Sequence, residues 1–164
     1  MKILDQRQIK HIIKRLAYEI VENHFDEEEI ILAGINRNGS GFAELLQAEL
    51  EAIGKVKIRR VRIRLNPAAP LSQPVEVSIP LPELKGRVII VVDDVANTGR
   101  TVFYACKPLM DVLPKKVEVA VLVDRKHKAF PMVPDYVGMS LATTLKEDID
   151  VRILEPDDQA VFLN

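Results

Sequence analysis

The 164-residue sequence has no tryptophan, only one cysteine and almost no net charge. Cys106 has no second cysteine with which to form an internal disulfide, as is typical of a protein in a reducing compartment. The three histidines, His11, His24 and His127, are too widely separated in sequence to indicate a metal site. A formal net charge of -1 excludes a strongly basic nucleic-acid-binding protein by bulk charge, although a local basic patch remains compatible with it.

Long apolar runs are also absent, and none reaches the length of a membrane span. The first five residues, MKILD, lack the apolar core of a signal peptide. The sequence is 48% hydrophobic and 29% charged, which is ordinary for a globular protein and argues against disorder. We therefore expect a cytoplasmic protein without membrane contact, folded as a single domain over residues 1–164.

The first third of the chain predicts a helix, a strand and a second helix. Asp5 and Gln8 resemble a capping pair, and apolar residues then repeat at helical spacing up to Val21. Residues 30–35 (IILAGI) are typical of a short buried strand, and residues 36–41 of a glycine-bearing loop. A second helix is expected from about Phe42 to a stop at Gly54.

Residues 56–65 (VKIRRVRIRL) alternate between apolar and basic side chains, with a slip at Arg59-Arg60 that predicts a β-bulge. Two interpretations stay open for Arg59, Arg60, Arg62 and Arg64. They protect an edge strand by charge, or they face an anion or RNA.

Five prolines in residues 66–82 exclude a helix or an interior strand there. We expect an extended loop that acts as a lid, with an edge-strand piece at residues 75–79. Further along, Pro108 predicts a kink or an early end in a helix over residues 102–113. Residues 119–123 and 136–141 are strand candidates, and the apolar tail segments, 151–154 and 161–163, are expected to dock without a defined register. This alternation predicts an α/β fold with a doubly wound, mostly parallel sheet flanked by helices.

The chain is organised around residues 88–101, VIIVVDDVANTGRT. Five apolar residues indicate a buried strand that delivers Asp93 and Asp94 into a cleft, where parallel sheets bind their ligands. A glycine turn then opens a helix, whose free N–H groups suit a phosphate. The carboxylates can accept hydrogen bonds from hydroxyl groups, and the turn beside them can bind a phosphate. This combination favours a sugar phosphate as ligand. The stretch lacks the lysine and glycine spacing of a P-loop and the G-x-G-x-x-G of a dinucleotide fold.

This stretch resembles the phosphoribosyl pyrophosphate motif of type I phosphoribosyltransferases. It is most similar to the branch of bifunctional pyrimidine-operon regulators with uracil phosphoribosyltransferase activity. The resemblance extends to residues 34–39 (GINRNG), at the place of the family's pyrophosphate loop, and to residues 121–143, and so covers about three quarters of the chain.

The resemblance implies an enzyme and assigns roles to individual residues. Asp93 and Asp94 would accept hydrogen bonds from the ribose hydroxyl groups. Arg37, with Asn38 and Gly39, would bind pyrophosphate. Mg²⁺ would be held mainly by substrate oxygens and water, near Asp93 and Asp94. The phosphate cradle would consist of Asn97, Thr98, Gly99, Arg100 and Thr101, and the nucleobase would stack on Tyr136 and bond to the backbone of Val137.

The sequence departs from the family pattern at two places. Purine-specific relatives usually carry an acid at Asn97, which favours a pyrimidine acceptor such as uracil over hypoxanthine or guanine. The pyrimidine regulators usually carry bulky residues where this chain has Ala96-Asn97, which leaves the acceptor base open. The alternative function is a nucleotide-sensing regulator that binds RNA through the arginines of residues 59–64 or through residues 125–128 (RKHK). On family grounds a homo-oligomer is expected.

Overall fold

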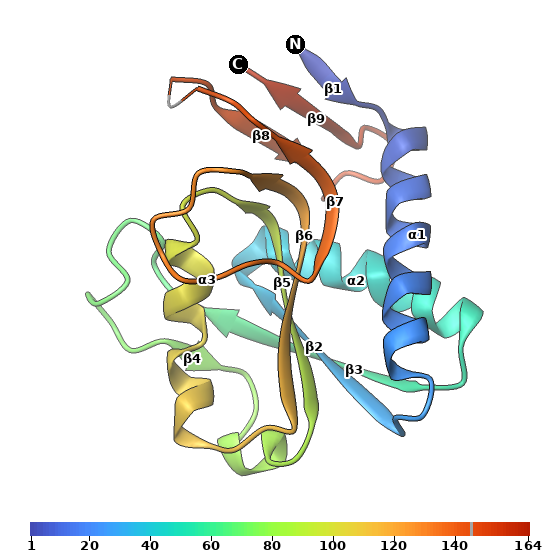
Figure 1. The fold of residues 1–164 in the computed structure, drawn as a ribbon, viewed down its shortest axis with the longest axis vertical. Helices are drawn as coiled ribbons and strands as arrows, with labels where there is room; N and C mark the ends of the chain where they lie inside the picture. The colour runs from blue at the N-terminus through green and yellow to red at the C-terminus, as the bar shows by residue number, and fades with distance from the viewer. Residues whose placement is uncertain (145) are drawn as a thin grey trace.

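A six-stranded, mostly parallel sheet forms the centre of the molecule (Figure 1). A computed structural model describes residues 1–144 and 146–164. The strand order is β4-β3-β2-β5-β6-β7, and every neighbouring pair is parallel except β3 with β4. The strands are β2 (Glu29–Ile35), β3 (Lys57–Arg64), β4 (Glu76–Val77), β5 (Val88–Ala96), β6 (Lys116–Arg125) and β7 (Tyr136–Leu141).

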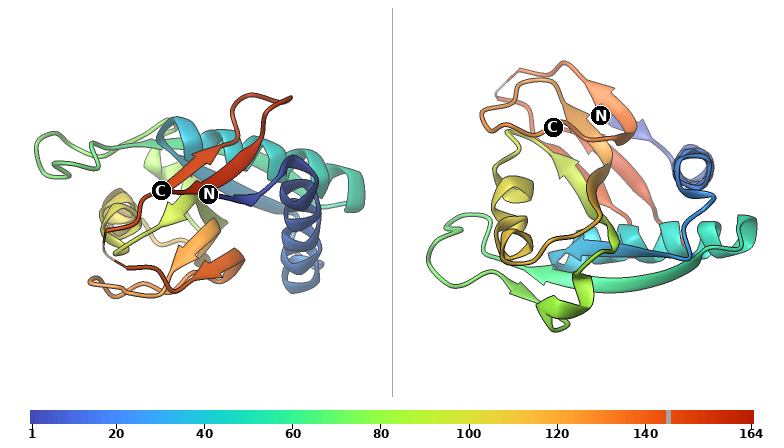
Figure 2. Two further views of the ribbon diagram at one scale, coloured as in Figure 1. Left: turned by 90° about the horizontal axis from the view of Figure 1, so that it is seen from above. Right: turned by 60° about the horizontal axis from the view of Figure 1, so that its bottom comes forward.

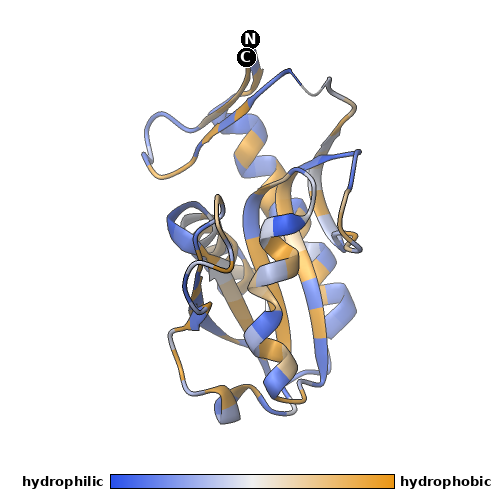
Figure 3. Ribbon diagram, turned by 90° about the vertical axis from the view of Figure 1, so that its left-hand side faces the viewer, coloured by the Kyte–Doolittle hydropathy of each residue, from blue (hydrophilic) through white to orange (hydrophobic). Residues whose placement is uncertain are grey.

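Helices cover both faces of this sheet. The long helices α1 (Gln6–His24) and α2 (Asn36–Ile53) contribute to one buried apolar cluster, together with alternate residues of the strands. The short helix α3 (Arg100–Ala105) and the 3₁₀ segments η1 (Leu81–Leu84) and η2 (Lys107–Asp111) border a second cluster. In Figure 3 the central strands are almost continuously hydrophobic, as expected for strands buried on both sides. The predicted doubly wound α/β fold is confirmed.

The two ends of the chain form a second, antiparallel sheet with the order β1-β9-β8. Its strands are β1 (Lys2–Leu4), β8 (Ile149–Arg152) and β9 (Ala160–Leu163). Figure 1 shows it beyond the carboxyl ends of β5 and β6, with both termini side by side. Strand β1 was not predicted from the sequence, because its pairing with β9 joins residues about 160 positions apart. The tail segments, which were expected to dock without a defined register, form the antiparallel pair β8 and β9.

Several local predictions are confirmed. Asp5 and Gln8 form a complete capping box at the start of α1, and Gly54 ends α2 with its N–H bonded to the Leu50 carbonyl. Pro108 ends the predicted helix early, because α3 stops at Ala105 and the chain continues as the 3₁₀ segment η2. The edge strand β4 lies within the predicted range 75–79.

Two local predictions are wrong. Residues 36–41 are not a loop, because α2 already begins at Asn36, directly after β2. The bulge at Arg59-Arg60 is absent, since β3 pairs with β2 in unbroken register from Lys57 to Ile63. The apparent slip has a simpler cause: Ile58 packs into the cluster with α2, whereas Val61 packs into the cluster on the opposite face.

The proline-rich segment after β3 has no regular structure until β4. Both views in Figure 2 show it as a green loop that extends away from the body of the molecule. It is tied to α3 at one point, where the Arg100 guanidinium donates to the Pro67 carbonyl at 2.7 Å. Among the described residues, no helix combines the length and the apolar character needed to cross a membrane.

Candidate functional site

A cavity of about 390 Å³ lies at the carboxyl ends of the central strands. It is bordered by the end of β2, the start of α2, the acid pair of β5, the turn before α3, the proline-rich loop and the start of β8. Its lining residues are Ile35, Asn36, Arg37, Asn38, Pro67, Asp93, Asp94, Val95, Asn97, Thr101 and Ile149. The two polar segments singled out in the sequence, residues 36–39 and 93–101, therefore meet in one cavity.

The start of α2 is joined directly to the acid pair. The Asn38 side-chain amide donates a hydrogen bond of 2.9 Å to Oδ2 of Asp94. Gly39 makes this approach possible, since a Cβ on Gly39 would lie 2.5 Å from the Val92 carbonyl oxygen. Gly39 is buried and is absent from the cavity lining, so its part is to let the helix sit against β5.

The two carboxylates differ in their surroundings. Asp93 is buried, with Oδ1 accepting from the Asp94 backbone N–H at 2.9 Å, whereas Asp94 is half-buried. Burial, followed by the charge and hydrogen bond of Asp94, raises the pKa of Asp93 well above its usual range. Neither carboxylate forms an ion pair with a lysine or arginine in the described part of the chain. A bound cation or hydrogen bonds from ligand hydroxyl groups would therefore stabilise negative charge on these carboxylates.

The turn between β5 and α3 surrounds a hollow of about 40 Å³, lined by residues 95–102. Gly99 adopts a φ of 85°, a left-handed conformation that favours glycine. The Thr98 carbonyl accepts from the backbone N–H groups of Ala129 and Phe130, at 2.9 and 3.2 Å. Lys128 adds a 2.6 Å bond to Asp124 and a 3.4 Å bond to the Ala96 carbonyl. The loop after β6 therefore fixes this turn from outside.

Arg37 is exposed and lines the cavity, while Arg100 points elsewhere, toward the Pro67 carbonyl. Asn36 has a φ of 52° and clamps the end of β3, because its side chain donates to the Leu65 carbonyl at 2.9 Å and accepts from the Leu65 N–H at 3.1 Å. Asparagine tolerates this left-handed conformation better than most residues. This clamp brings residues 65–67 to the rim of the cavity.

The structure contradicts stacking of a base on Tyr136. Tyr136 is 1% exposed and lies at the start of β7, paired with Ala120, away from the carboxyl ends of the strands. Its hydroxyl donates to Glu118 at 3.1 Å and accepts from Asn23 at 3.1 Å, and burial raises its pKa. Val137 is likewise outside the cavity, with its carbonyl accepting from Arg15 at 3.3 Å. Both residues belong to the core and the sheet edge.

Several residues that line the cavity were not predicted individually from the sequence. Ile149, the first residue of β8, supplies an apolar wall, and Pro67 and Val95 complete the rim. Ile149 carries no chemical signal in the sequence, and its position depends on the pairing of β8 with β9. Asn36, Pro67 and Val95, by contrast, lie in segments that the sequence had singled out, namely residues 34–39, 66–82 and 88–101.

Comparison with known proteins agrees with this geometry. Residues 1–156 match the family model described as "Phosphoribosyl transferase domain". The chain is 34% identical over 171 residues to "Bifunctional protein PyrR" of Pediococcus pentosaceus, covering 99% of this chain and 97% of that protein. It is 36% identical over 167 residues to the protein of the same name from Pelotomaculum thermopropionicum, covering 96% and 91%.

Among solved structures, the hypoxanthine phosphoribosyltransferase of Trypanosoma cruzi superposes with a TM-score of 0.77 at 17% identity, covering 99% of this chain and 95% of that one. At this identity the similarity establishes the fold alone. Together with the family match and the full-length relatives, it leads to one conclusion: the chain belongs to the phosphoribosyltransferase family, in the branch of the bifunctional PyrR proteins.

Proposed function

We propose that this protein transfers the phosphoribosyl group of phosphoribosyl pyrophosphate to a pyrimidine base, with uracil as the acceptor and pyrophosphate as the leaving group. The observation that supports this best is the meeting of Asp93 and Asp94 with Arg37 and Asn38 in one cavity, next to the Thr98–Thr101 turn. We propose further that residues 1–164 act as one domain and that the protein works in the cytoplasm as a homo-oligomer.

In this proposal each segment holds one part of the substrate. Asp93 and Asp94 accept hydrogen bonds from the ribose hydroxyls and stabilise the positive charge that develops as the bond from C1 to pyrophosphate breaks. The turn of Asn97, Thr98, Gly99, Arg100 and Thr101 holds the 5-phosphate through backbone N–H and hydroxyl groups. Arg37, with the first-turn N–H group of Asn38, holds the pyrophosphate as it takes up negative charge.

The donor set fits Mg²⁺. Asp93 and Asp94 supply hard oxygen ligands, and the raised pKa of Asp93 indicates that added positive charge would stabilise its ionised form. When bound, the ion would neutralise charge on the pyrophosphate oxygens. Grouped His, Cys, Asp or Glu side chains sufficient for an all-protein metal site are absent from the described residues. We propose that Mg²⁺ is held mainly by substrate oxygens and water.

The acceptor base is proposed to lie between the ribose site and Ile149. Ile149 offers an apolar surface and Asn97 an amide, and an amide cannot act as the general base that a purine would require. The proline-rich loop of residues 66–75 is proposed to act as a lid that excludes water from the activated sugar.

The test is nucleotide formation from phosphoribosyl pyrophosphate with each free base in turn. Uracil should give uridine monophosphate in a Mg²⁺-dependent reaction, and hypoxanthine and guanine should react at least tenfold more slowly. The double variant Asp93→Asn/Asp94→Asn should lose about 10²-fold or more in kcat/KM, whereas Asp111→Asn, in η2, should retain wild-type activity. Activity that survives loss of both carboxylates would refute the assigned mechanism.

A second function, RNA-dependent regulation of pyrimidine genes, is supported by one structural feature. Arg60, Arg62 and Arg64 are all exposed and share one side of β3. In the other basic segment, by contrast, Arg125 and Lys128 are engaged by the Glu147 carbonyl and by Asp124. Affinity for a pyrimidine-operon leader RNA should fall steeply with salt and change when uridine monophosphate is added. Absence of binding at low salt would exclude this function.

A further inference from the structure

A second cavity lies beside the proposed catalytic pocket, between α2 and β3. Its volume is about 410 Å³, within the range of small-molecule sites. Three arginines border it: Arg37 from the first turn of α2, and Arg60 and Arg62 from β3. Ser40 and Ser78 border it as well, and Glu44 is the one acidic residue in its lining.

The charge of this cavity is not compensated internally. Glu44 is 72% exposed, and its carboxylate lies 3.6 Å from Arg60, a surface ion pair that contributes little. Within the described residues, the side chains of Arg37 and Arg62 form no ion pair. Three guanidinium groups against one carboxylate leave an excess of positive charge facing an open cavity.

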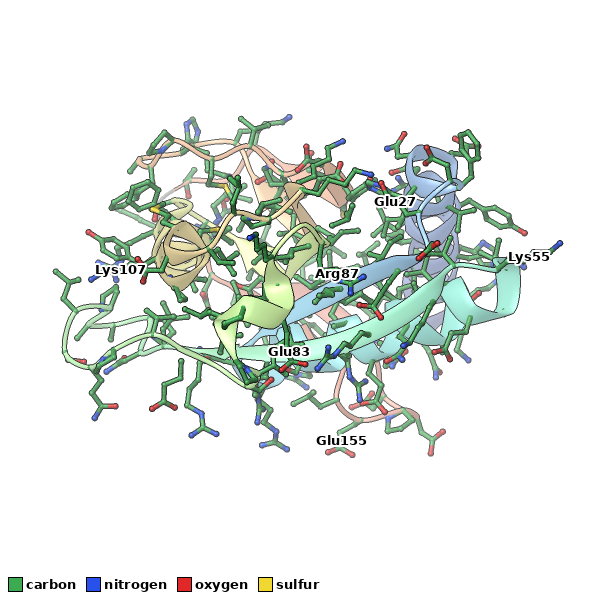
Figure 4. The ribbon with its side chains drawn as sticks, turned by 90° about the horizontal axis from the view of Figure 1, so that it is seen from below. Glu27, Lys55, Glu83, Arg87, Lys107 and Glu155 are labelled. Carbon is green, nitrogen blue, oxygen red and sulfur yellow. The ribbon has the colours of Figure 1, made fainter. Side chains whose placement is uncertain are left out.

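The opposite side of β3 is different. There Arg59 pairs with Glu83 of η1 at 3.0 Å, and Lys57 pairs with Glu29 of β2 at 3.3 Å. Figure 4 shows η1, with Glu83 labelled, alongside β3. On the cavity side, Arg60 has only the exposed Glu44 at 3.6 Å, and Arg62 pairs with no acid among the described residues, a difference that protection of the sheet edge by charge would not require. Because Arg64 shares the side of Arg60 and Arg62 but does not line the cavity, edge protection and ligand binding can be separated by experiment.

The chemistry of the lining selects a phosphate-bearing ligand. Guanidinium groups bind phosphate oxygens in pairs of parallel hydrogen bonds. The Ser78 hydroxyl already accepts from the Arg62 backbone N–H at 2.9 Å, which leaves its own proton free to donate to an anion. Ser40 makes only a long bond of 3.4 Å to the Gly34 carbonyl. Three cations and two hydroxyl groups suit a di- or triphosphate better than a single phosphate.

We propose that this cavity is a second anion site, which binds the polyphosphate group of a nucleotide and is coupled to the catalytic pocket through Arg37. Arg37 lines both cavities, so an anion in the second cavity competes for the same guanidinium group that the proposed mechanism directs at pyrophosphate. Binding at either site therefore changes affinity at the other by the same factor. The coupling rests on the proposed function, which assigns Arg37 to pyrophosphate. Binding of an anion in the second cavity does not depend on it.

Calorimetric titration of the full chain with inorganic tripolyphosphate tests the proposal without catalytic turnover. Wild type should show a binding event that weakens at least about tenfold in Arg60→Ala/Arg62→Ala, the size expected for lost charge-assisted hydrogen bonds. The matched control Arg64→Ala, on the same side of β3, should stay within twofold of wild type. Because the titration measures binding alone, its result can be interpreted even if the protein shows no transferase activity.

The coupling has its own measurement. Tripolyphosphate should raise the apparent Kd for phosphoribosyl pyrophosphate more in wild type than in Arg60→Ala/Arg62→Ala. Equal binding by all three proteins, or an equal loss in Arg64→Ala, would overturn the proposal in favour of general surface charge. A smaller oligomer in the double variant would also overturn the proposal, because it would assign the two arginines to a subunit contact. Displacement of tripolyphosphate by RNA but not by nucleoside triphosphates would overturn it as well.

Discussion

The side-chain amide of Asn38 donates a 2.9 Å hydrogen bond to Oδ2 of Asp94 and so links two segments that are 56 residues apart in the sequence. One comes from the first turn of α2 and the other from the end region of β5. This bond fixes the distance between the proposed pyrophosphate and ribose sites.

Asn38→Ala should free Asp94 to rotate. We expect kcat/KM to fall by about ten- to a hundredfold, because small displacements of positioning groups have effects of this size. Steady-state kinetics with phosphoribosyl pyrophosphate and uracil measures the change. Gln47→Ala is the control, since the Gln47 amide also donates to an acid, Glu51, but on the exposed surface of α2. Equal rates for Asn38→Ala and wild type would show that the bond has no catalytic part.

Asp93→Asn should raise the free energy of unfolding at neutral pH by roughly 0.5–2 kcal/mol, the usual range for removing a functional strain. The pKa of Asp93 is raised in the folded state, so its ionised form costs stability above the folded pKa and this cost disappears as pH falls below the ordinary value of 3.8. The difference between variant and wild type should therefore shrink on acidification. Urea titrations at a series of pH values measure it, and a difference that grows toward low pH would contradict the raised pKa of Asp93.

Gly39→Ala should destabilise the protein by about 1–3 kcal/mol, as expected for overpacking. The new Cβ would lie 2.5 Å from the Val92 backbone carbonyl, which cannot move without shifting β5. Gly41→Ala, in the same helix, is the matched control: its Cβ would meet only the end of the Leu154 side chain, which can rotate away. Thermal unfolding compares the two, and a smaller loss for Gly39→Ala than for Gly41→Ala would show that the helix does not approach β5 this closely.

Tyr136→Phe should lower stability and leave the KM for the base unchanged. The Tyr136 hydroxyl joins a buried group of polar side chains, with Glu118 and His24 also hydrogen-bonded to each other. Removing it takes a donor from the buried Glu118 carboxylate, at a cost of about 1–3 kcal/mol. Tyr104→Phe, a half-buried tyrosine in α3, serves as control. A raised KM with unchanged stability would instead support contact with the base.

Local signals predicted the elements that depend on neighbouring residues. The capping pair Asp5 and Gln8, the stop at Gly54 and the early helix end at Pro108 all act within a few residues, and each was found as predicted. The acid pair and the turn at Gly99 were likewise placed correctly, because an apolar strand followed by a glycine turn specifies its own geometry.

Where the sequence-based predictions failed, the decisive contacts were distant. The family resemblance implied that Tyr136 stacks on the base, yet Asn23, His24 and Glu118 surround its hydroxyl in the core. The predicted bulge at Arg59-Arg60 is absent, because two different layers cover the two faces of β3, which an alternation pattern alone cannot show.

The sequence by itself determined the parallel sheet, the acid pair at its end and the phosphate-type turn, because these depend on hydrophobic period and local backbone preference. Only the tertiary structure decided that the two termini form a second sheet, that Ile149 walls the cavity and that Arg37 stands between two cavities. These features arise from contacts between distant segments, which no local pattern encodes.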